Sequence, residues 1–238
     1  ATFQKSRILP SLLYYLLKNI IIVDFTCKER NHMEIELKYA VDDISTAERI
    51  LEDEYIKSVE ESRTDEELKA IYFDTDDYIL FRNDIAFRIR KEGQKVVASL
   101  KWNGKCSGAL HSREELNINL GEGDCPEMPD PGVFSESETG KELMELLKDK
   151  TLGGIMKVYV SRKTVRVDTG EGIFEIALDN GKIVAGGGTC PVCEMEIELY
   201  SGNQEEMLKL GEKLQQKYDL EPEKRSKYAR GLALLGKI

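Results

Sequence analysis

The sequence predicts an α+β protein built on a closed antiparallel β-barrel with peripheral helices. The first indication is the segment of residues 33–40, in which charged side chains alternate with apolar ones. Side chains two positions apart on a strand share a face, so Glu34, Glu36 and Lys38 form a charged row with an apolar row opposite. A single strand of this kind is typical of a sheet with one solvated face.

The second indication is that the same alternation returns in several later segments. Charged residues in phase recur within residues 87–90, 98–101, 113–116, 160–167 and 193–199. The residues in these rows are Arg88, Arg90, Lys101, Arg113, Glu115, Arg162, Arg166, Glu194, Glu196 and Glu198. Many strands with one charged face each predict one shared charged surface, which we place on the inside of the barrel.

The chemistry of such a bore follows from its residue types. Carboxylates that cluster alone repel one another and favour a divalent cation, and hard oxygen ligands suit Mg²⁺ or Mn²⁺. Arginine and lysine in the same bore favour a polyanion, because guanidinium groups match phosphate oxygens. The pattern therefore indicates a metal-chelated polyphosphate as the ligand.

The remaining elements follow from periodicity and turn residues. Apolar spacing predicts helices over residues 42–57, 141–148, 203–218 and 222–235. Further strands are expected over residues 70–74, 96–102, 109–120, 155–167 and 173–178. Residues 121–137 are rich in proline and glycine and are expected to form a long loop. Residues 179–181, Asp-Asn-Gly, are typical of a tight hairpin turn, and residues 186–188 of a flexible one.

Composition limits the classes of function. A chain of 238 residues fits one large domain, and 41% hydrophobic residues are enough for a core. The net charge of −10 argues against a nucleic-acid binder, which is normally basic. With two histidines, His32 and His111, a histidine-based catalytic triad is unsupported.

The cysteines indicate a reducing compartment. There are five, an odd number without a visible pairing framework, which predicts a cytoplasmic location. Cys190 and Cys193 have the spacing of a zinc or redox motif, but no second Cys or His pair accompanies them. The alternative is that residues 190–193 form a turn leading into the following strand.

Taken in chain order, the charged motifs resemble those of the CYTH or triphosphate tunnel metalloenzyme superfamily. The motifs are Glu34-x-Glu36-x-Lys38, Phe87-Arg88-Ile89-Arg90, Lys101, Arg113-x-Glu115, Asp179, Glu196-x-Glu198 and Lys227. The resemblance covers roughly residues 33–238 and extends to residues 72–75, Tyr-Phe-Asp-Thr. It implies a closed eight-stranded barrel that forms a tunnel, and metal-dependent hydrolysis of a triphosphate.

The resemblance also implies roles for individual residues. The metal ligands, for Mg²⁺ or Mn²⁺, would be Glu34, Glu36, Glu115, Asp179, Glu196 and Glu198. The phosphate ligands would be Lys38, Arg88, Arg90, Lys101, Arg113, Arg162, Arg166 and Lys227. Direct catalytic roles would fall to Glu34, Glu36, Lys38, Arg88 and Lys101. Two questions stay open: whether Asp179 is only a turn residue, and whether Arg162 or Arg166 is the functional arginine.

Residues 1–32 precede these motifs and are expected to lie outside the fold, so that the domain spans residues 33–238. Their apolar run is interrupted and falls short of the about 20 residues that a membrane-spanning helix needs. A signal peptide is the alternative, but no small-x-small cleavage site precedes the first strand. Because the first motif of the family usually begins near the initiator methionine, we expect Met33 to be the natural start.

The predicted reaction is hydrolysis of inorganic tripolyphosphate to pyrophosphate and phosphate. A class IV adenylate cyclase and a thiamine triphosphatase are alternatives within the superfamily, and a non-catalytic polyphosphate-binding module is an alternative of another class. A purely structural barrel is disfavoured, because burying this many charges without a ligand is costly. The expected partner is a small-molecule triphosphate or polyphosphate, with neither nucleic acid nor membrane; monomer and homodimer both stay open.

Overall fold

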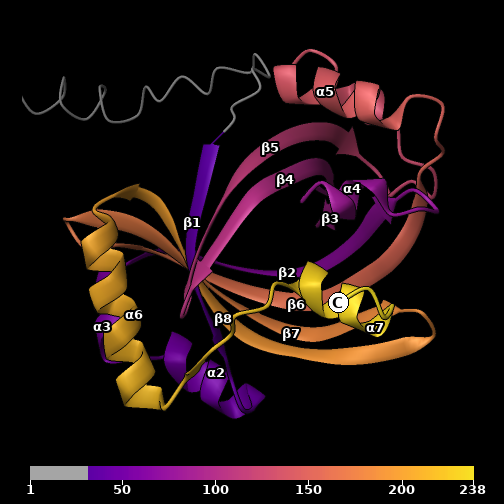
Figure 1. Cartoon of the computed structure of the whole chain (residues 1–238). Helices are drawn as coiled ribbons and strands as arrows, with labels where there is room; N and C mark the ends of the chain where they lie inside the picture. The colour runs from indigo at the N-terminus through magenta and orange to yellow at the C-terminus, as the bar shows by residue number, and fades with distance from the viewer. Residues whose placement is uncertain (1–31) are drawn as a thin grey trace, which may run out of the picture.

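A computed structural model of the chain describes residues 32–238, so the expected extension falls outside the described residues except for His32. Eight strands form a closed antiparallel barrel (Figure 1). They are β1 (His32–Ala40), β2 (Glu60–Asp74), β3 (Ala86–Glu92), β4 (Lys95–Ser107), β5 (Leu110–Glu122), β6 (Gly153–Asp168), β7 (Gly172–Ala185) and β8 (Gly188–Gly202). This architecture confirms the predicted fold class.

The barrel closes through its first strand. The strand order is β5-β4-β3-β2-β6-β7-β8-β1, and β1 pairs with β5 as well as with β8. Closure leaves no exposed edge among these eight strands and gives the sheet an inside and an outside face. A two-residue strand, β9 (Glu221–Pro222), adds to the end of β1 at Tyr39 and Ala40.

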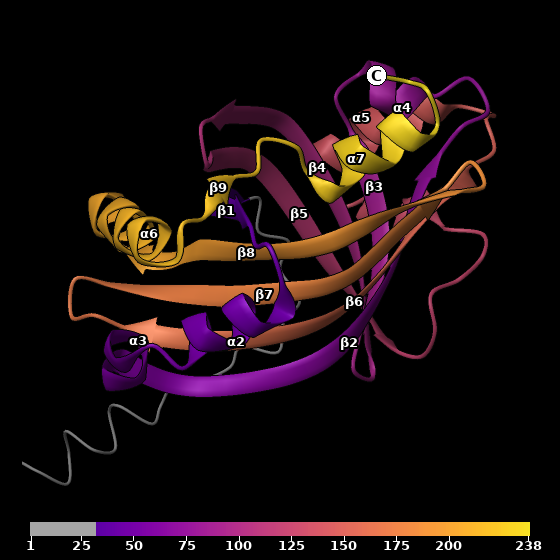
Figure 2. The same cartoon turned by 90° about the horizontal axis from the view of Figure 1, so that it is seen from below.

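Helices gather near the two ends of the long strands (Figures 1 and 2). Near one end lie α2 (Ile44–Leu51), α3 (Glu54–Val59) and α6 (Gln204–Tyr218). Toward the other lie α4 (Ile79–Arg82), α5 (Glu138–Leu147) and α7 (Lys227–Leu234), with the short 3₁₀ helix η1 (Pro131–Phe134) beside α5. None of the helices in residues 32–238 has the length and apolar character needed to cross a bilayer.

The outer face of the barrel is apolar and packs against the helices. Leu37 of β1 and Ile197 of β8 share one core with Met207 and Leu210 of α6. Gly211 allows this close approach, because a Cβ there would lie 2.2 Å from a methyl carbon of Leu37. Since the apolar residues face outward, the alternate residues of the same strands are left to face the bore.

The predicted helices were correct in kind but not in all boundaries. The helix expected over residues 42–57 is two helices, because Asp53 interrupts it and caps α3, accepting a hydrogen bond from the Tyr55 amide at 2.8 Å. The helix expected over residues 222–235 begins only at Lys227, where Ser226 is the N-cap. The helix over residues 203–218 is confirmed as α6, with Asn203 as its cap.

The turn predicted at residues 179–181 was wrong. These residues lie in the middle of β7, where Asp179 pairs with Arg162 of β6. The chain turns instead at Gly186 and Gly187, whose φ angles of 56° and 78° suit glycine, so a turn there is confirmed.

The turn reading of residues 190–193 was also wrong, since β8 already begins at Gly188. In residues 32–238, no cluster suited to a metal includes Cys190 or Cys193.

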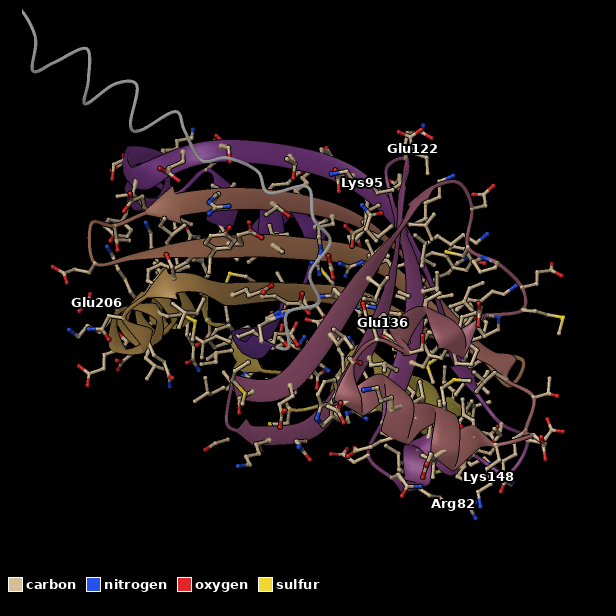
Figure 3. All side chains as sticks on the ribbon, turned by 90° about the horizontal axis from the view of Figure 1, so that it is seen from above. Arg82, Lys95, Glu122, Glu136, Lys148 and Glu206 are labelled. Carbon is tan, nitrogen blue, oxygen red and sulfur yellow. The ribbon has the colours of Figure 1, made fainter. Side chains whose placement is uncertain are left out.

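Several strands are longer than expected. β2 begins at Glu60 rather than near residue 70, because its polar first half pairs with β6. β4 begins at Lys95 and β5 ends at Glu122. These two residues pair with each other at the open end of the hairpin (Figure 3). The extra length matters for the site, because it continues the bore beyond the apolar segments that alternation identified.

Candidate functional site

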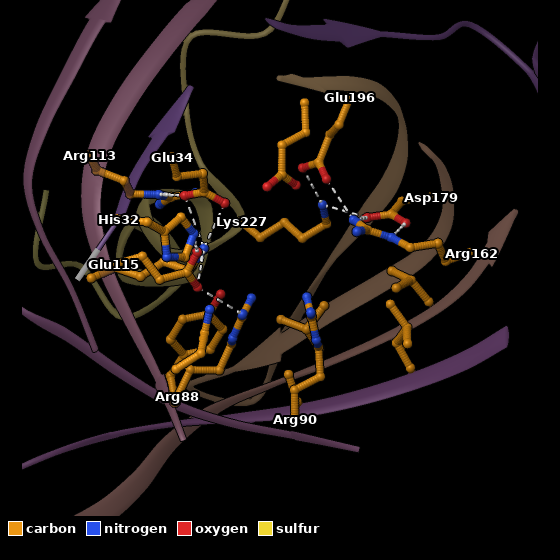
Figure 4. Close-up of a pocket in the computed structure, with 18 residues that line it drawn as sticks. His32, Glu34, Arg88, Arg90, Arg113, Glu115, Arg162, Asp179, Glu196 and Lys227 are labelled. Carbon is orange, nitrogen blue, oxygen red and sulfur yellow. Dashed lines mark hydrogen bonds and ion pairs between the residues drawn. The ribbon is translucent and has the colours of Figure 1, made fainter. Parts of the chain in front are cut away.

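The bore of the barrel contains a cavity of about 160 Å³, here called the main cavity (Figure 4). Most of its lining is charged. The charged residues that line it are Glu34, Arg88, Arg90, Lys101, Arg113, Glu115, Arg162, Asp179, Glu196, Glu198 and Lys227. These residues come from seven strands and α7, so the closed barrel is what assembles them.

Strand register explains which opposite charges meet. Glu34 of β1 lies directly opposite Arg113 of β5, and Lys101 of β4 lies opposite Glu115 of β5. On the other side of the bore, Arg162 of β6 lies opposite Asp179 of β7. Directly opposed side chains on neighbouring strands are within reach of each other, so the register itself creates ion pairs.

The first cluster of charges surrounds Glu34. Its carboxylate oxygens accept hydrogen bonds from the Lys101 ammonium at 2.8 and 3.0 Å, and from Arg113 Nε at 2.5 Å. The Lys101 ammonium also lies 2.9 Å from Glu115. Burial alone would raise the pKa of Glu34, but Lys101 and Arg113 outweigh it and hold the pKa well below its usual range. Glu34 is therefore ionised.

The second cluster surrounds Asp179 and Glu196. Arg162 donates to the two oxygens of Asp179, each at 2.6 Å, and to Glu196 at 2.5 Å. The Lys227 ammonium lies 2.6 Å from Asp179 and 3.0 Å from Glu196, and it also contacts Glu194. Burial would raise the pKa of Asp179, but Arg162 and Lys227 outweigh it and lower the pKa to about 2.

Glu36 and Lys38 are not among the residues that line the main cavity, but their contacts connect the two clusters. Both are buried, with 3% and 2% of their surface exposed. Glu36 accepts a hydrogen bond from Arg113 at 3.1 Å and lies 3.3 Å from the Lys38 ammonium, which in turn donates to Glu196. Burial would lower the pKa of Lys38, but Glu196 and Glu36 outweigh it and raise the pKa.

Glu198 is the exception among the acids of the bore. In the described part of the chain it forms no ion pair, although it lines the main cavity. Burial and then the nearby carboxylate of Glu34 raise its pKa to about 7. Glu198 can therefore gain or lose a proton near neutral pH.

The structure separates Arg162 from Arg166. Arg162 lines the main cavity, whereas Arg166 lines a neighbouring cavity of about 240 Å³, here called the outer cavity. There the Arg166 guanidinium stacks over the ring of Tyr200, 3.8 Å from its centroid, and lies 3.5 Å from Glu175. Of the two arginines, Arg162 is the one in the main cavity.

Sequence reasoning overlooked some residues of this network. Arg230 of α7 is buried and pairs with Glu194, which sequence analysis had noted without assigning it a role. Its position three residues after Lys227 on one helix was an available signal. Tyr72 was noted only as part of the Tyr-Phe-Asp-Thr segment; it lines the main cavity and stacks on Tyr228, with the ring centroids 5.3 Å apart.

The donor set fits both a cation and an anion. Carboxylate oxygens of Asp179, Glu194 and Glu196 lie within 4.8 Å of one another, and such hard ligands suit Mg²⁺ or Mn²⁺. Arg88 keeps a buried Nε without a hydrogen-bond partner among the described residues. A buried donor without a partner is costly, so a ligand acceptor beside Arg88 would remove that cost.

The closed barrel places carboxylates opposite guanidinium and ammonium groups, and this donor set suits both a divalent cation and an anion. The protein-family model described as CYTH domain matches residues 32–232 of this chain. The chain belongs to the CYTH domain family.

The comparisons include one curated relative and two solved structures. The inorganic triphosphatase of Haemophilus influenzae is 34% identical over 163 residues, which are 68% of this chain and 44% of the relative. The chain thus spans less than half of that relative's length.

Both solved structures confirm the fold. One, from Hippeastrum, is a candidate adenylyl cyclase described as having a dominant triphosphatase activity. It is 20% identical, with a TM-score of 0.58, and the match covers 86% of this chain and 97% of that one. An adenylate cyclase candidate from Bacillus halodurans is 19% identical, with a TM-score of 0.52, over 82% of this chain and 95% of that one.

Proposed function

We propose that the protein is a metal-dependent triphosphatase that hydrolyses inorganic tripolyphosphate to pyrophosphate and phosphate. The observation that carries the proposal is the main cavity, where paired acids face cations and Arg88 has a buried donor to spare. The relative from Haemophilus influenzae is an inorganic triphosphatase, which supports the same activity.

Each set of residues has a role in this reaction. Arg88, Arg90, Lys101, Arg113, Arg162 and Lys227 line the main cavity and would bind phosphate oxygens and stabilise charge on the transferred group. Lys38 is buried among acids, so we assign it to holding Glu36 and Glu196 in place. Arg166 would contact only a part of the substrate that extends into the outer cavity.

Six acids are the candidates to hold one or two divalent cations. They are Glu34, Glu36, Glu115, Asp179, Glu196 and Glu198. When bound, Mg²⁺ or Mn²⁺ would neutralise phosphate charge and lower the pKa of a coordinated water. Glu198, whose pKa is about 7 without metal, would accept a proton from the attacking water when it does not itself coordinate the cation. Reaction then needs no protein nucleophile.

The outer cavity favours an inorganic substrate over an organic one. It adjoins the main cavity through Leu68, Arg90 and Arg162, so a substrate can enter that way. The described residues that line it are hydroxyl-bearing or charged apart from Leu68, and Tyr200, whose ring lies against Arg166, is not among them. A cyclase acting on ATP, or a thiamine triphosphatase, would need an organic group held there, which this lining does not favour.

We also propose a small-molecule partner and a cytoplasmic location. The four cysteines of the described residues are all free, which is usual in a reducing compartment. The net charge of −10 supports a small polyanion in a local basic bore over nucleic acid on the surface.

Phosphate release from the full chain tests the proposal. Tripolyphosphate, ATP and thiamine triphosphate are compared in Mg²⁺, Mn²⁺ or EDTA, with cyclic AMP measured in the ATP arm. We expect EDTA-sensitive release from tripolyphosphate that is lost in Glu36→Gln. Cyclic AMP formation would make the protein a cyclase, and tight tripolyphosphate binding without release would make it a binding module.

A further inference from the structure

A third cavity adjoins the main cavity at a different place from the outer cavity. This rear cavity, of about 200 Å³, shares Lys101 and Arg113 with the main cavity. The outer cavity instead shares Arg90 and Arg162 with it. Figure 4 shows Arg113 and Arg162 on opposite sides of the main cavity. The three cavities therefore form a series, with the main cavity in the middle.

The rear cavity carries an excess of positive charge. Among residues 32–238, four cations line it, and Asp84 is the one carboxylate in its lining. The cations are Lys101, Lys105, Arg113 and Lys224. Lys105 and Lys224 are exposed, and neither forms an ion pair with any residue of the described chain. Asp84 accepts a hydrogen bond from the Gly104 amide at 3.2 Å. The cavity therefore favours an anion from solution.

Helix α7 adds to this preference. Its N-cap Ser226, together with Tyr228 and Ala229, lines the rear cavity, so the first turn of the helix faces it. The N-terminal end of a helix carries partial positive charge and favours phosphate groups. His111 of β5 donates a hydrogen bond to the Glu223 carbonyl at 2.9 Å, which holds the segment before α7 against the barrel.

Two residues common to both cavities provide a route between them. Lys101 and Arg113 now hold the carboxylate of Glu34. A phosphate group that displaced the Glu34 carboxylate from these two cations would lie at the boundary between the two cavities. An anion can therefore pass from the main to the rear cavity while keeping contact with at least one cation throughout, which lowers the cost of moving it.

We propose that the rear cavity binds inorganic pyrophosphate or phosphate and is the route by which these products leave the main cavity. Binding by the rear cavity stands on its lining alone, whereas the exit role rests on the proposed triphosphatase function. Entry through the outer cavity and departure through the rear cavity would let a second substrate enter before product has left.

The rear cavity contains its own reporters. Trp102, the one tryptophan of the chain, and the exposed Cys106 both line it. The full chain in EDTA is titrated with inorganic pyrophosphate while Trp102 emission and the alkylation rate of Cys106 are measured, the latter by peptide mass spectrometry. We expect alkylation of Cys106 to slow at least threefold while Cys190 is unaffected. Unchanged alkylation of Cys106 at saturating pyrophosphate would overturn the proposal.

Variants locate the bound anion. Lys105→Ala/Lys224→Ala should abolish the protection of Cys106, and Lys95→Ala/Lys182→Ala, which removes two exposed lysines elsewhere, should preserve it. Arg162→Ala, at the far side of the main cavity, should also preserve it. Protection that survives the first variant, or that is lost in Arg162→Ala, would place the anion in the main cavity and contradict the proposal.

A turnover experiment separates an exit route from a site that is filled from solution. Tripolyphosphate and Mg²⁺ are supplied together with a soluble pyrophosphatase that destroys free pyrophosphate, and a matched sample of Glu36→Gln receives the same mixture with the phosphate that accumulates. Protection of Cys106 that is stronger in the active protein than in this matched sample supports passage of product through the rear cavity, and equal protection overturns the exit role. If the protein hydrolyses no tripolyphosphate, the exit role fails with the proposed function, while protection by added pyrophosphate still reports on binding.

Discussion

Glu36 of β1 and Glu198 of β8 lie directly opposite each other in the antiparallel ladder of the barrel. Like charges directly opposite each other are unfavourable, and the surroundings of the two carboxylates differ. Glu36 is compensated by Arg113 and Lys38. Glu198 is not, and burial followed by Glu34 raises its pKa to about 7. The register therefore places an acid that has two cationic partners beside one that titrates near neutral pH.

The titration of Glu198 predicts a pH-dependent stability of the metal-free protein. Because the folded state raises this pKa to about 7, the folded state prefers protonated Glu198. The stability that Glu198 contributes is present below its unfolded pKa and is lost as pH rises through about 7. In EDTA, Glu198→Gln should gain melting temperature relative to wild type between pH 6 and pH 8. Glu175→Gln, in the outer cavity, is the control, and parallel melting curves for Glu198→Gln and wild type would contradict the prediction.

Much of this site could be predicted from the sequence because alternation on a strand decides which side chains share a face. Glu34 and Arg113 belong to such rows, and the barrel register brings them into contact. The order of the motifs along the chain then indicated the family, which implied closure. Neither inference needs a contact between specific side chains to be known in advance.

The parts that could not be predicted depend on pairing between distant segments. Asp179 precedes Asn180 and Gly181, a strong local turn signal, yet pairing with β6 extends the strand through all three residues. The contact between Arg230 and Glu194 likewise depends on where α7 docks, which no local pattern specifies. Tertiary pairing overrode turn chemistry in the first case and supplied the partner in the second.

Replacement of Arg88 is expected to lower activity even when the new side chain is also a cation. Its side chain lines the main cavity with a buried Nε that has no hydrogen-bond partner in the described part of the chain, so a phosphate oxygen is its expected acceptor. Arg88→Lys retains the charge but loses the planar guanidinium donors. We expect kcat/KM for tripolyphosphate to fall by about 10²-fold, with little change in melting temperature. Arg82→Lys, on the exposed end of α4, is the matched control; equal activities of the two variants would refute this role.

Removal of the Lys227 ammonium is expected to change how strongly Mg²⁺ stabilises the protein. Its ammonium lies 2.6 Å from Asp179 and 3.0 Å from Glu196 and neutralises them. Lys227→Met removes that charge at similar side-chain size, which should cost about 3 kcal/mol of stability in EDTA, because buried acids lose a partner. Added Mg²⁺ should then raise the melting temperature of the variant more than that of wild type.

The control for Lys227→Met is Lys209→Met, which removes a lysine from an exposed ion pair with Glu206 on α6. This variant should respond to Mg²⁺ as wild type does, since an exposed pair contributes little to stability. A Mg²⁺ response of Lys227→Met no larger than that of Lys209→Met would show that the ammonium does not neutralise a cation site.

Substitutions of Arg162 and Arg166 are expected to affect the kinetic constants differently, although both residues lie on β6 and face the same side of the sheet. Arg162 lines the main cavity and holds Asp179 at 2.6 Å, whereas Arg166 lies in the outer cavity over Tyr200. Arg162→Ala should therefore lower kcat by about 10²-fold. Arg166→Ala should leave kcat unchanged and raise KM by less than about tenfold, because its contact is outside the reacting region. Steady-state kinetics with tripolyphosphate measure both constants. A fall in kcat for Arg166→Ala equal to that for Arg162→Ala would mean that the reacting phosphate lies in the outer cavity, and the assignment of the site within the barrel would have to move outward with it.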